Sequence, residues 1–382
     1  MHISNLKAKN WKNFRKIDVQ LEHRLFLIGP NASGKSNFLD IFRFLRDLSV
    51  SGGGLRQAVD VRRGGVSALR CLAARREPDI IIDVEIKGDR NDETWNYHLS
   101  FSQDTNRRPF IRKEEVKLNG QTILLRPDEK DQSDSLRLTE TALEQTVANK
   151  DFRPVVQFFQ SFSYQHLVPQ AMRDPQGFSS GKNEDDPFGR DFLQRVENTS
   201  EKSRDSRLNK ISAAMKVAVP QLEKLEVSRD NYGVPHLIGL YSHWRPNASK
   251  QNEAQFSDGT LRLFGLLWTL FEGDGPLLME EPELSLHPEI VRHLPQIIEK
   301  VLRLRKIRRQ VLISTHSVEM LDQASIGADE VLWLTPSAEG TLVNSPYQDD
   351  EARLMLESGL TVADVIIPKS APENIEQLAF SF

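Results

Sequence analysis

The pattern of hydrophobic and polar positions predicts a strand-rich beginning, a mixed middle and an alternating end. Residues 6–29 predict two or three strands, of which the last is "RLFLIG", and a helical pattern follows directly at 37–48. Near the other end the predicted strands are 276–281, 309–315 and 330–336, and the predicted helices are 287–306 and 317–325. Strands that alternate with helices predict a parallel sheet built from β–α–β units.

The middle of the chain first predicts an antiparallel meander. Its strands are 79–88, 94–103 and 110–127, with polar turns between them. Residues 133–150 are polar and predict a helical segment, and 153–170 predict a return to strands.

A long polar loop and a hairpin complete the middle. The loop covers 173–190, and its length is typical of a mobile segment or a lid. A helical portion that runs through 217–227 leads to a hairpin whose turn is Asn231 to Gly233. Close to the C-terminus, "LTVADVIIPKS" at 360–370 predicts an ordinary packing strand, with partner docking as the alternative.

These patterns predict an α/β fold: a mainly parallel sheet flanked by helices, with an antiparallel β subdomain and a helical insertion. The expected portions are 1–132, which contains the β subdomain, 133–254, which forms the insertion or lid, and 255–382.

Composition and charge restrict the functional classes. The chain has 382 residues, 38% hydrophobic and 27% charged, which is enough for one large or two medium cores. Its net charge of −4 gives no global basic field, so contact with nucleic acid would have to be local. The basic candidates are the run at 300–309 and the cluster Lys7, Lys9, Lys12, Arg15 and Lys16.

We expect a cytoplasmic protein. Cys71 is the single cysteine and cannot form an intramolecular disulfide, and the first residues lack the apolar core of a signal peptide. The longest apolar run, 261–271, is interrupted by Arg262 and is far shorter than the roughly 20 residues that a membrane span needs.

A phosphate-binding loop is the strongest chemical signal. "GPNASGKS" at 29–36 matches G-x-x-x-x-G-K-[ST] at every fixed position, between a predicted strand and a predicted helix. Its glycines let backbone N–H groups approach phosphate, Lys35 would reach the β- and γ-phosphates, and Ser36 would ligate Mg²⁺. The expected nucleotide contacts are Gly29, Pro30, Asn31, Ala32, Ser33, Gly34, Lys35, Ser36 and Asn37.

Acidic and histidine side chains follow two later strands. "PLLMEEPE" ends a short apolar strand with two carboxylates, and we assign Glu280 to the metal and Glu281 to the general base. His316 follows the strand in "VLISTHSVE", at the edge where a parallel sheet binds ligands, which favours a γ-phosphate contact. Glu283 stays unassigned, and His287 either caps the next helix or faces a partner subunit.

Together "GPNASGKS", "FSDGTLR", "LLMEEPELSLHP" and "LISTHS" resemble the P-loop, signature, magnesium and base strand with its D-loop, and switch histidine of ABC-type ATPases. The chain looks closest to the RecF and structural-maintenance-of-chromosomes branch, and within it to ATPases of overcoming-lysogenization-defect and related prokaryotic phage-defence systems. The resemblance covers about 1–48 and 255–335, and it implies an ABC-type P-loop fold, ATP and Mg²⁺.

The resemblance also implies a shared site. In such ATPases the signature turn of one subunit closes over the γ-phosphate held by another, so Ser257, Asp258 and Gly259 would contact ATP in a homodimer or higher homo-oligomer. Ser257 is also suited to cap the helix that follows it. Gln170 is our choice for the glutamine that approaches nucleotide and metal, and Gln165 is the alternative.

Two residues depart from the superfamily pattern. Glu280 stands where the metal-binding acid is usually Asp, and Asp258 stands where transporters usually have Gly, although the Ser-Asp-Gly-Thr form is known in the defence-type branch.

The expected function is an ATP-hydrolysing sensor or clamp for a separately encoded effector, a nuclease or a toxin, in antiviral defence. About 45 residues follow 330–336, which leaves no room for the fused nuclease module of related proteins. The alternatives are a RecF-like DNA-repair ATPase, a scaffold that binds ATP without hydrolysis, and a transporter subunit, against which the signature and the β-rich middle argue. Arg62 and Arg63 would either face solvent or contact nucleotide or a neighbouring subunit.

Overall fold

The computed structural model describes residues 1–74, 77–88, 93–173, 186–242, 250–305, 308–322 and 325–370. Most of the predicted loop at 173–190 and part of the basic run at 300–309 therefore lie outside the described residues. The chain forms two compact units that each combine separate segments. Unit 1 contains 1–163, 274–278 and 307–382, and unit 2 contains 164–273 and 279–306. These units follow spatial contacts, whereas the predicted boundaries at 132 and 254 follow the order of motifs.

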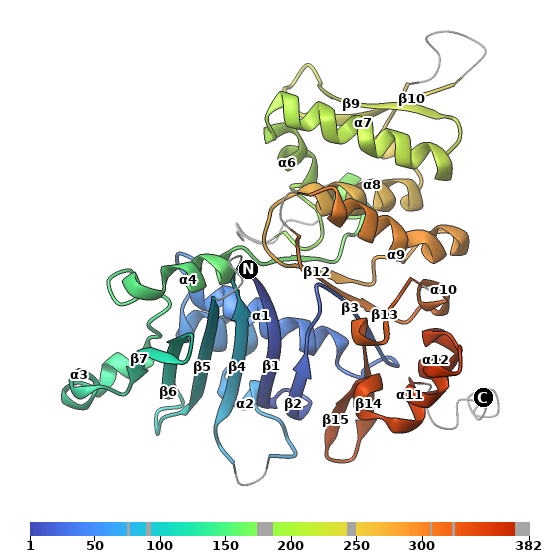
Figure 1. Cartoon of the computed structure of the whole chain (residues 1–382). Coiled ribbons are helices and arrows are strands. Elements are labelled where there is room, and N and C mark those ends of the chain that lie inside the picture. The colour runs from blue at the N-terminus through green and yellow to red at the C-terminus, as the bar shows by residue number, and fades with distance from the viewer. Residues whose placement is uncertain are drawn as a thin grey trace, which may run out of the picture. The chain divides into compact units, whose positions relative to one another are not determined.

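Unit 1 contains the predicted antiparallel sheet. Its order is β2-β1-β4-β5-β6-β7, and every neighbouring pair is antiparallel. Figure 1 shows β5, β4, β1 and β2 side by side in this order. The strands are β1 (His2–Trp11), β2 (Phe14–Gln20), β4 (Ile80–Lys87), β5 (Thr94–Gln103), β6 (Pro109–Leu118) and β7 (Gln121–Arg126).

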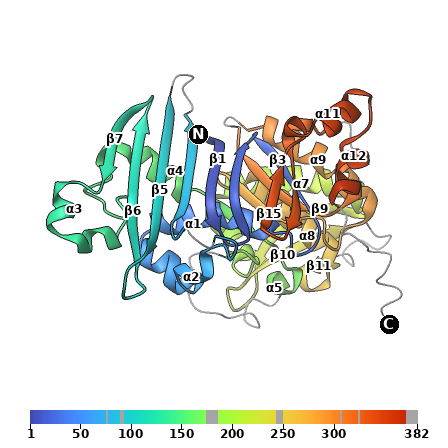
Figure 2. The ribbon, with the colours of Figure 1, turned by 90° about the horizontal axis from the view of Figure 1, so that it is seen from below.

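Two predictions for the helical segments of unit 1 are wrong. Residues 153–160 were predicted as strand but form α4 (Arg153–Gln160), because Pro154 suits a helix start and the apolar residues recur at helical spacing. Residues 133–150 were predicted as one helical segment but contain only α3 (Glu129–Ser133) at their start and short 3₁₀ turns at Ser135–Thr139 and Lys150–Phe152. Figure 2 shows α3 beside the β6–β7 edge.

The second sheet has the order β15-β14-β3-β13-β12-β8. Its centre is parallel, since β3 (Arg24–Ile28) pairs in parallel with both β13 (Val311–Thr315) and β14 (Val331–Ser337). The edge strand β15 (Gly340–Asn344) is antiparallel, and β12 (Leu277–Glu280) and β8 (Ser163–Gln165) complete the order. The predicted α/β fold with a mainly parallel sheet is confirmed.

The remaining elements of unit 1 are mostly short. One prediction is wrong here, because "LTVADVIIPKS" contains helix α12 and no strand. Thr361 and Asp364 exchange side-chain and backbone hydrogen bonds of 3.0 and 3.2 Å, which is a capping box that starts a helix. The elements are α1 (Lys35–Ser49), η1 (Gln57–Val61), α2 (Val66–Leu69), α10 (Val318–Leu321), η6 (Ala328–Glu330), η7 (Pro346–Gln348), α11 (Asp350–Glu357) and α12 (Val362–Ser370).

Unit 2 combines helices with a three-stranded antiparallel sheet of order β11-β10-β9. The predicted hairpin is confirmed, since Asp230 Oδ1 accepts the Tyr232 and Val234 N–H groups at 2.8 Å across its turn. Figure 1 shows α7 lying along β9 and β10. The elements are α5 (Pro169–Arg173), α6 (Phe192–Asn198), α7 (Glu201–Ala218), β9 (Leu222–Arg229), β10 (Pro235–Tyr241), β11 (Lys250–Asn252), η5 (Glu253–Gln255), α8 (Asp258–Phe271) and α9 (Pro288–Arg303). None of the helices within the described ranges combines the length and apolar character that crossing a bilayer requires.

Candidate nucleotide site

The loop at 29–34 joins buried strand β3 to helix α1, and its glycines are required by space and by backbone conformation. A Cβ at Gly29 would lie 2.6 Å from Ser33 Oγ and 2.9 Å from the Leu334 carbonyl oxygen. Gly34 has φ 99°, and a Cβ there would lie 2.1 Å from Asn13 Nδ2. Ala32 also has a positive φ, 63°. Such left-handed conformations turn successive N–H groups of a loop toward one side, which is how phosphate loops bind anions.

Asn13, in the turn between β1 and β2, supports the loop from behind. Its Nδ2 donates to the Ser33 carbonyl at 2.9 Å and to Thr341 Oγ1 at 2.8 Å, and its Oδ1 accepts from Asn37 Nδ2 at 2.8 Å. Thr341 Oγ1 donates to the same Ser33 carbonyl at 2.9 Å. Segments far apart in the sequence therefore hold the loop through neutral hydrogen bonds, and Asn13 and Thr341 are site residues that the motif search missed.

Helix α1 starts without a side-chain cap, and Lys35 lies inside the loop. Gly34 occupies the N-cap position and has no side chain that could cap the helix. Lys35 is 7% exposed, and its ammonium group donates to the carbonyls of Gly29 at 2.7 Å and Pro30 at 3.3 Å. A helix start with N–H groups not bonded to a capping side chain and a buried cation beside it form a site suited to phosphate.

His316 lies at the edge of the sheet where the loop begins. The parallel register pairs Thr315 with Ile28, so His316 and Gly29 each follow one member of the same pair. His316 is exposed, whereas Ser314 and Thr315 before it are fully buried. Within unit 1 the fold therefore brings together two of the predicted site segments, the phosphate loop and the histidine.

A buried ion network fixes the flank of α1. Arg63 donates to Asp40 through Nε at 2.9 Å and Nη2 at 2.7 Å, and to Asp47 through Nη1 at 2.7 Å. Lys12 pairs with Asp40 at 2.7 Å, and Arg62 pairs with Asp47. Burial raises the pKa of Asp40, but its pairs with Arg63 and Lys12 outweigh burial and lower that pKa to about 2. Of the two predicted loop arginines, Arg63 does not face solvent.

The acidic segment belongs to unit 2. Glu280, at the end of β12, accepts a hydrogen bond on Oε2 from the Tyr164 hydroxyl, and its carbonyl lies 3.2 Å from His166 Nδ1. Glu281 has φ 45°, a conformation that is uncommon for residues other than glycine and that concentrates at functional sites. The carbonyl of Glu281 accepts from Arg262 Nη1 at 3.1 Å.

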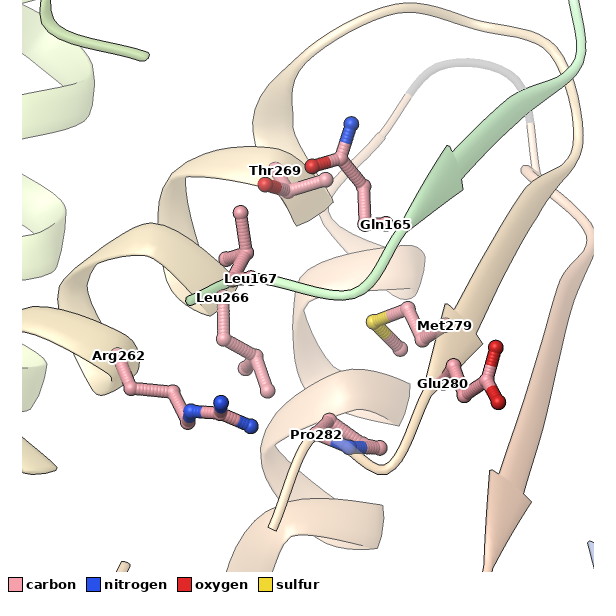
Figure 3. Close-up of a pocket in the computed structure, with 8 residues that line it drawn as sticks. All are labelled: Gln165, Leu167, Arg262, Leu266, Thr269, Met279, Glu280 and Pro282. Atoms are coloured by element: carbon pink, nitrogen blue, oxygen red, sulfur yellow. The ribbon is translucent and has the colours of Figure 1, made fainter. Parts of the chain in front are cut away.

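A small cavity of about 20 Å³ lies beside this segment, large enough for about one water molecule. Figure 3 shows its lining from α8, from β8 and the residues just after it, and from the end of β12 and the residues just after it: Gln165, Leu167, Arg262, Leu266, Thr269, Met279, Glu280 and Pro282. Of the two glutamines considered for the metal, Gln165 therefore shares a cavity with Glu280. Gln170 lies instead on α5, where its Nε2 donates to Asp258 Oδ2 at 2.9 Å.

The signature turn begins helix α8 as predicted. Ser257 is the N-cap and its Oγ accepts from the Thr260 N–H at 3.1 Å. Asp258 is paired with Arg173 at 2.5 Å as well as with Gln170. A Cβ at Gly259 would lie 2.7 Å from the Ser285 carbonyl oxygen, so the turn packs closely against the segment that follows the two acids.

Two other predictions now have a structural context. His287 caps α9, since its Nδ1 accepts from the Glu289 N–H at 3.2 Å. The basic run at 300–309 is not one exposed surface, because Arg309 is 2% exposed and donates to the Gly275 carbonyl at 2.5 Å. In the N-terminal basic cluster, Lys12 pairs with Asp40 and Arg15 pairs with Glu339.

One protein-family model covers all the predicted site segments. A family model described as "AAA domain, putative AbiEii toxin, Type IV TA system" matches residues 25–322, a span that includes the phosphate loop, the signature turn, the acidic segment and His316. The chain belongs to this AAA-domain family. Membership agrees with the predicted resemblance to ABC-type ATPases.

The chain has the same fold as solved head domains of structural-maintenance-of-chromosomes proteins. An SmcHead bound to the C-winged helix domain of ScpA aligns with a TM-score of 0.53 and 13% identity, over 90% of this chain and 97% of that chain. An Smc head with an extended coiled coil, bound to the C-terminal domain of ScpA derived from Pyrococcus furiosus, aligns with a TM-score of 0.50 and 12% identity, over 94% and 99%.

A curated relative matches over a short region. Endonuclease GajA of Bacillus cereus (strain VD045) is 40% identical over 50 residues, which are 13% of this chain and 9% of that relative. The chain thus aligns with less than a tenth of the endonuclease.

Proposed function

We propose that the chain binds ATP with Mg²⁺ at the phosphate loop and hydrolyses it. The supporting observation is the β3–β13 register, which sets the loop and His316 at one sheet edge. Backbone N–H groups at 29–36 and Lys35 would hold the phosphates, and His316 would contact the γ-phosphate. When bound, Mg²⁺ would neutralise charge that develops on the phosphates.

In this proposal the acids of unit 2 act on the same nucleotide. Ser36 and Glu280 would hold the metal, and Glu281 would orient the attacking water and accept its proton. Gln165 is the better candidate for the glutamine near the metal, because it lines the cavity beside Glu280 while Gln170 is bonded to Asp258.

We further propose that two copies share each ATP, with Ser257 and Gly259 of one closing over the γ-phosphate bound by the other. A helix start with a small polar turn is suited to this role. The short match to an endonuclease favours an effector that cleaves nucleic acid, with this chain as its sensor or clamp in antiviral defence.

Phosphate release by the wild type, Lys35→Ala and Glu281→Gln tests hydrolysis. Removing the base should lower kcat by about 10²- to 10⁴-fold with nucleotide binding retained, and Lys35→Ala should lose binding. A wild type that binds ATP but releases phosphate no faster than Glu281→Gln would replace this proposal with the scaffold alternative.

Ser257→Gly tests the shared site, because glycine at an N-cap costs only a few tenths of a kcal/mol and so removes the hydroxyl with little effect on α8. Light scattering with ATP in the Glu281→Gln background should show dimers that the added Ser257→Gly change weakens. Unchanged dimerisation together with unchanged turnover would exclude the shared site.

A further inference from the structure

We propose that Arg262 is a positioning residue for the reaction: it holds the backbone of Glu281 and so joins the signature helix to the general base. The inference rests on the proposed function, and it assigns Arg262 a role that motif matching leaves open. Arg262 lies in α8, five residues after Ser257. All the contacts that support it lie within unit 2.

The first observation is a direct hydrogen bond. Arg262 is 5% exposed, and its Nη1 donates to the Glu281 carbonyl at 3.1 Å. The same carbonyl accepts the Leu284 N–H at 3.3 Å, which closes the turn after the base. Figure 3 shows the Arg262 guanidinium pointing from α8 toward Pro282, the residue next to Glu281.

The second observation is the conformation that this bond supports. Glu281 has φ 45° and Ser285 has φ 63°, so the segment between them begins and ends in a conformation that side chains other than glycine disfavour. Such a conformation persists only where surrounding contacts enforce it. Arg262 supplies one such contact at the first of these residues.

The third observation is that α8 also holds the other end of the segment. The Cβ that Gly259 lacks would lie 2.7 Å from the Ser285 carbonyl oxygen, so the two backbones are in close contact. The signature helix therefore fixes the segment twice, through Arg262 at Glu281 and through Gly259 at Ser285. A movement of the signature turn would be transmitted to the backbone of the base.

Charge explains why an arginine serves here. Burial lowers the pKa of Arg262, and the carboxylates of Glu283, Asp258 and Glu281 oppose that effect. Its Nε is buried without a hydrogen-bond partner among the described residues, and Arg262 lines the cavity that Glu280 also lines. A guanidinium keeps its charge under these conditions and offers several donors in one plane.

The test measures ATP turnover and affinity in the full chain for Arg262→Met, Arg262→Lys and the matched control Arg305→Met. Arg305 also donates to a backbone carbonyl of α8, that of Leu270 at 2.8 Å, which lies at the opposite end of the helix from Ser257. Arg262→Met should lower kcat about 100-fold, the cost of displacing a catalytic group by about 1 Å, with KM for ATP nearly unchanged. Arg262→Lys keeps one donor and should recover part of the rate, while Arg305→Met should keep the wild-type kcat.

A double variant separates positioning from a general loss of structure. In the Glu281→Gln background, Arg262→Met should change the residual rate by less than about twofold, because effects of residues that act as a unit are not additive. Hydrogen exchange should also become faster at 281–286 in Arg262→Met and not in Arg305→Met.

The outcomes distinguish this inference from the function on which it rests. An active wild type with an equally active Arg262→Met overturns the inference and leaves the proposed function standing. An Arg262→Met effect of equal size with and without the Glu281 carboxylate also overturns it. If the wild type releases no phosphate, the proposed function fails, and the exchange comparison decides the Arg262 contact on its own.

Discussion

Helices α1 and α8 both begin at a turn suited to phosphate, but they are prepared in different ways. Helix α1 starts at Gly34 with no capping side chain, and neutral hydrogen bonds from Asn13 hold the turn before it. Helix α8 starts at Ser257, whose hydroxyl already accepts a backbone N–H, and its first residue is an aspartate paired with Arg173. The first turn therefore begins at a glycine with no capping side chain, whereas the second begins beside a carboxylate that its ion pair neutralises.

The sides of the two helices differ as well. Helix α1 buries Asp40 and Asp47 against Arg63, while α8 is buried from Leu261 to Leu270 with Arg262 as the one charged residue in that stretch. The orientation of α1 is thus fixed by ion pairs inside unit 1. That of α8 is fixed by apolar packing, which leaves its single arginine available to contact the acidic segment.

The largest effect should come from breaking the ion network of α1. Arg63→Met leaves two buried carboxylates without their main partner, so the free energy of unfolding should fall by about 3–5 kcal/mol. Urea denaturation measures this loss, and Arg62→Met is the control, because the Arg62 side chain is 33% exposed and its one ion pair among the described residues is with Asp47. Equal losses for the two variants would show that the buried network does not fix α1.

Next in size is the start of α1. Gly34→Ala places a side chain at φ 99° against the Asn13 amide, and nucleotide affinity should fall about 100-fold as the loop shifts. Gly52→Ala is the matched control, since Gly52 also has a positive φ of 72°, but a Cβ there would lie within 4 Å of no described atom beyond its chain neighbours. Calorimetric titration with ATP compares them, and unchanged affinity in Gly34→Ala would show that the Asn13 support is dispensable.

The pH dependence of stability should reveal the Asp40 pairs. The pKa of this carboxyl falls from 3.8 to about 2 on folding, so its contribution is present above pH 3.8 and is lost as pH drops toward 2. The loss should be about 2 kcal/mol. Asp40→Asn should flatten the denaturation profile between these pH values, whereas Asp18→Asn, which alters an exposed pair with Lys7, should not.

The smallest effect concerns the start of α8. Arg173→Gln removes the partner of a half-exposed carboxylate, so stability should change by less than about 1 kcal/mol, and by less still at high salt. Turnover should fall, because the uncompensated Asp258 would repel phosphate. Adding Asp258→Gly to Arg173→Gln should restore turnover. A double variant as slow as Arg173→Gln would show that repulsion by the Asp258 carboxylate is not the cause of the slower turnover.

Much of the fold could be predicted from local patterns. The P-loop motif fixed the position of the β3–α1 junction, and the alternation of strands and helices predicted a parallel sheet, because both signals depend on residues close together in the sequence. The strand predictions at 153–160 and 360–370 were wrong for an identifiable reason. Apolar runs of this length fit either element, and the decisive signals were Pro154 and the Thr361–Asp364 capping box.

The supports of the candidate site could not be predicted in the same way. Asn13 and Thr341 are more than 300 residues apart in the sequence, and they share the Ser33 carbonyl only in the folded chain. In the sequence Arg262 is a single polar residue in an apolar helical stretch. No residue near it in the sequence indicates that its guanidinium contacts the Glu281 carbonyl. Asp258 was recognised from its motif, but its pairing with Arg173 depends on how α5 packs.

The hydrogen bonds of Thr341 carry a consequence for gene truncation. Every recognised motif ends by Ser317, and the family match ends at residue 322, so a shortened gene that stops near codon 335 would still encode the complete set. Its product would lack the Thr341 hydroxyl on the Ser33 carbonyl and the Thr341 N–H that donates to Asn13 at 2.7 Å. Such an allele would pass a motif search as an intact ATPase while its phosphate loop had lost one of its two supporting side chains.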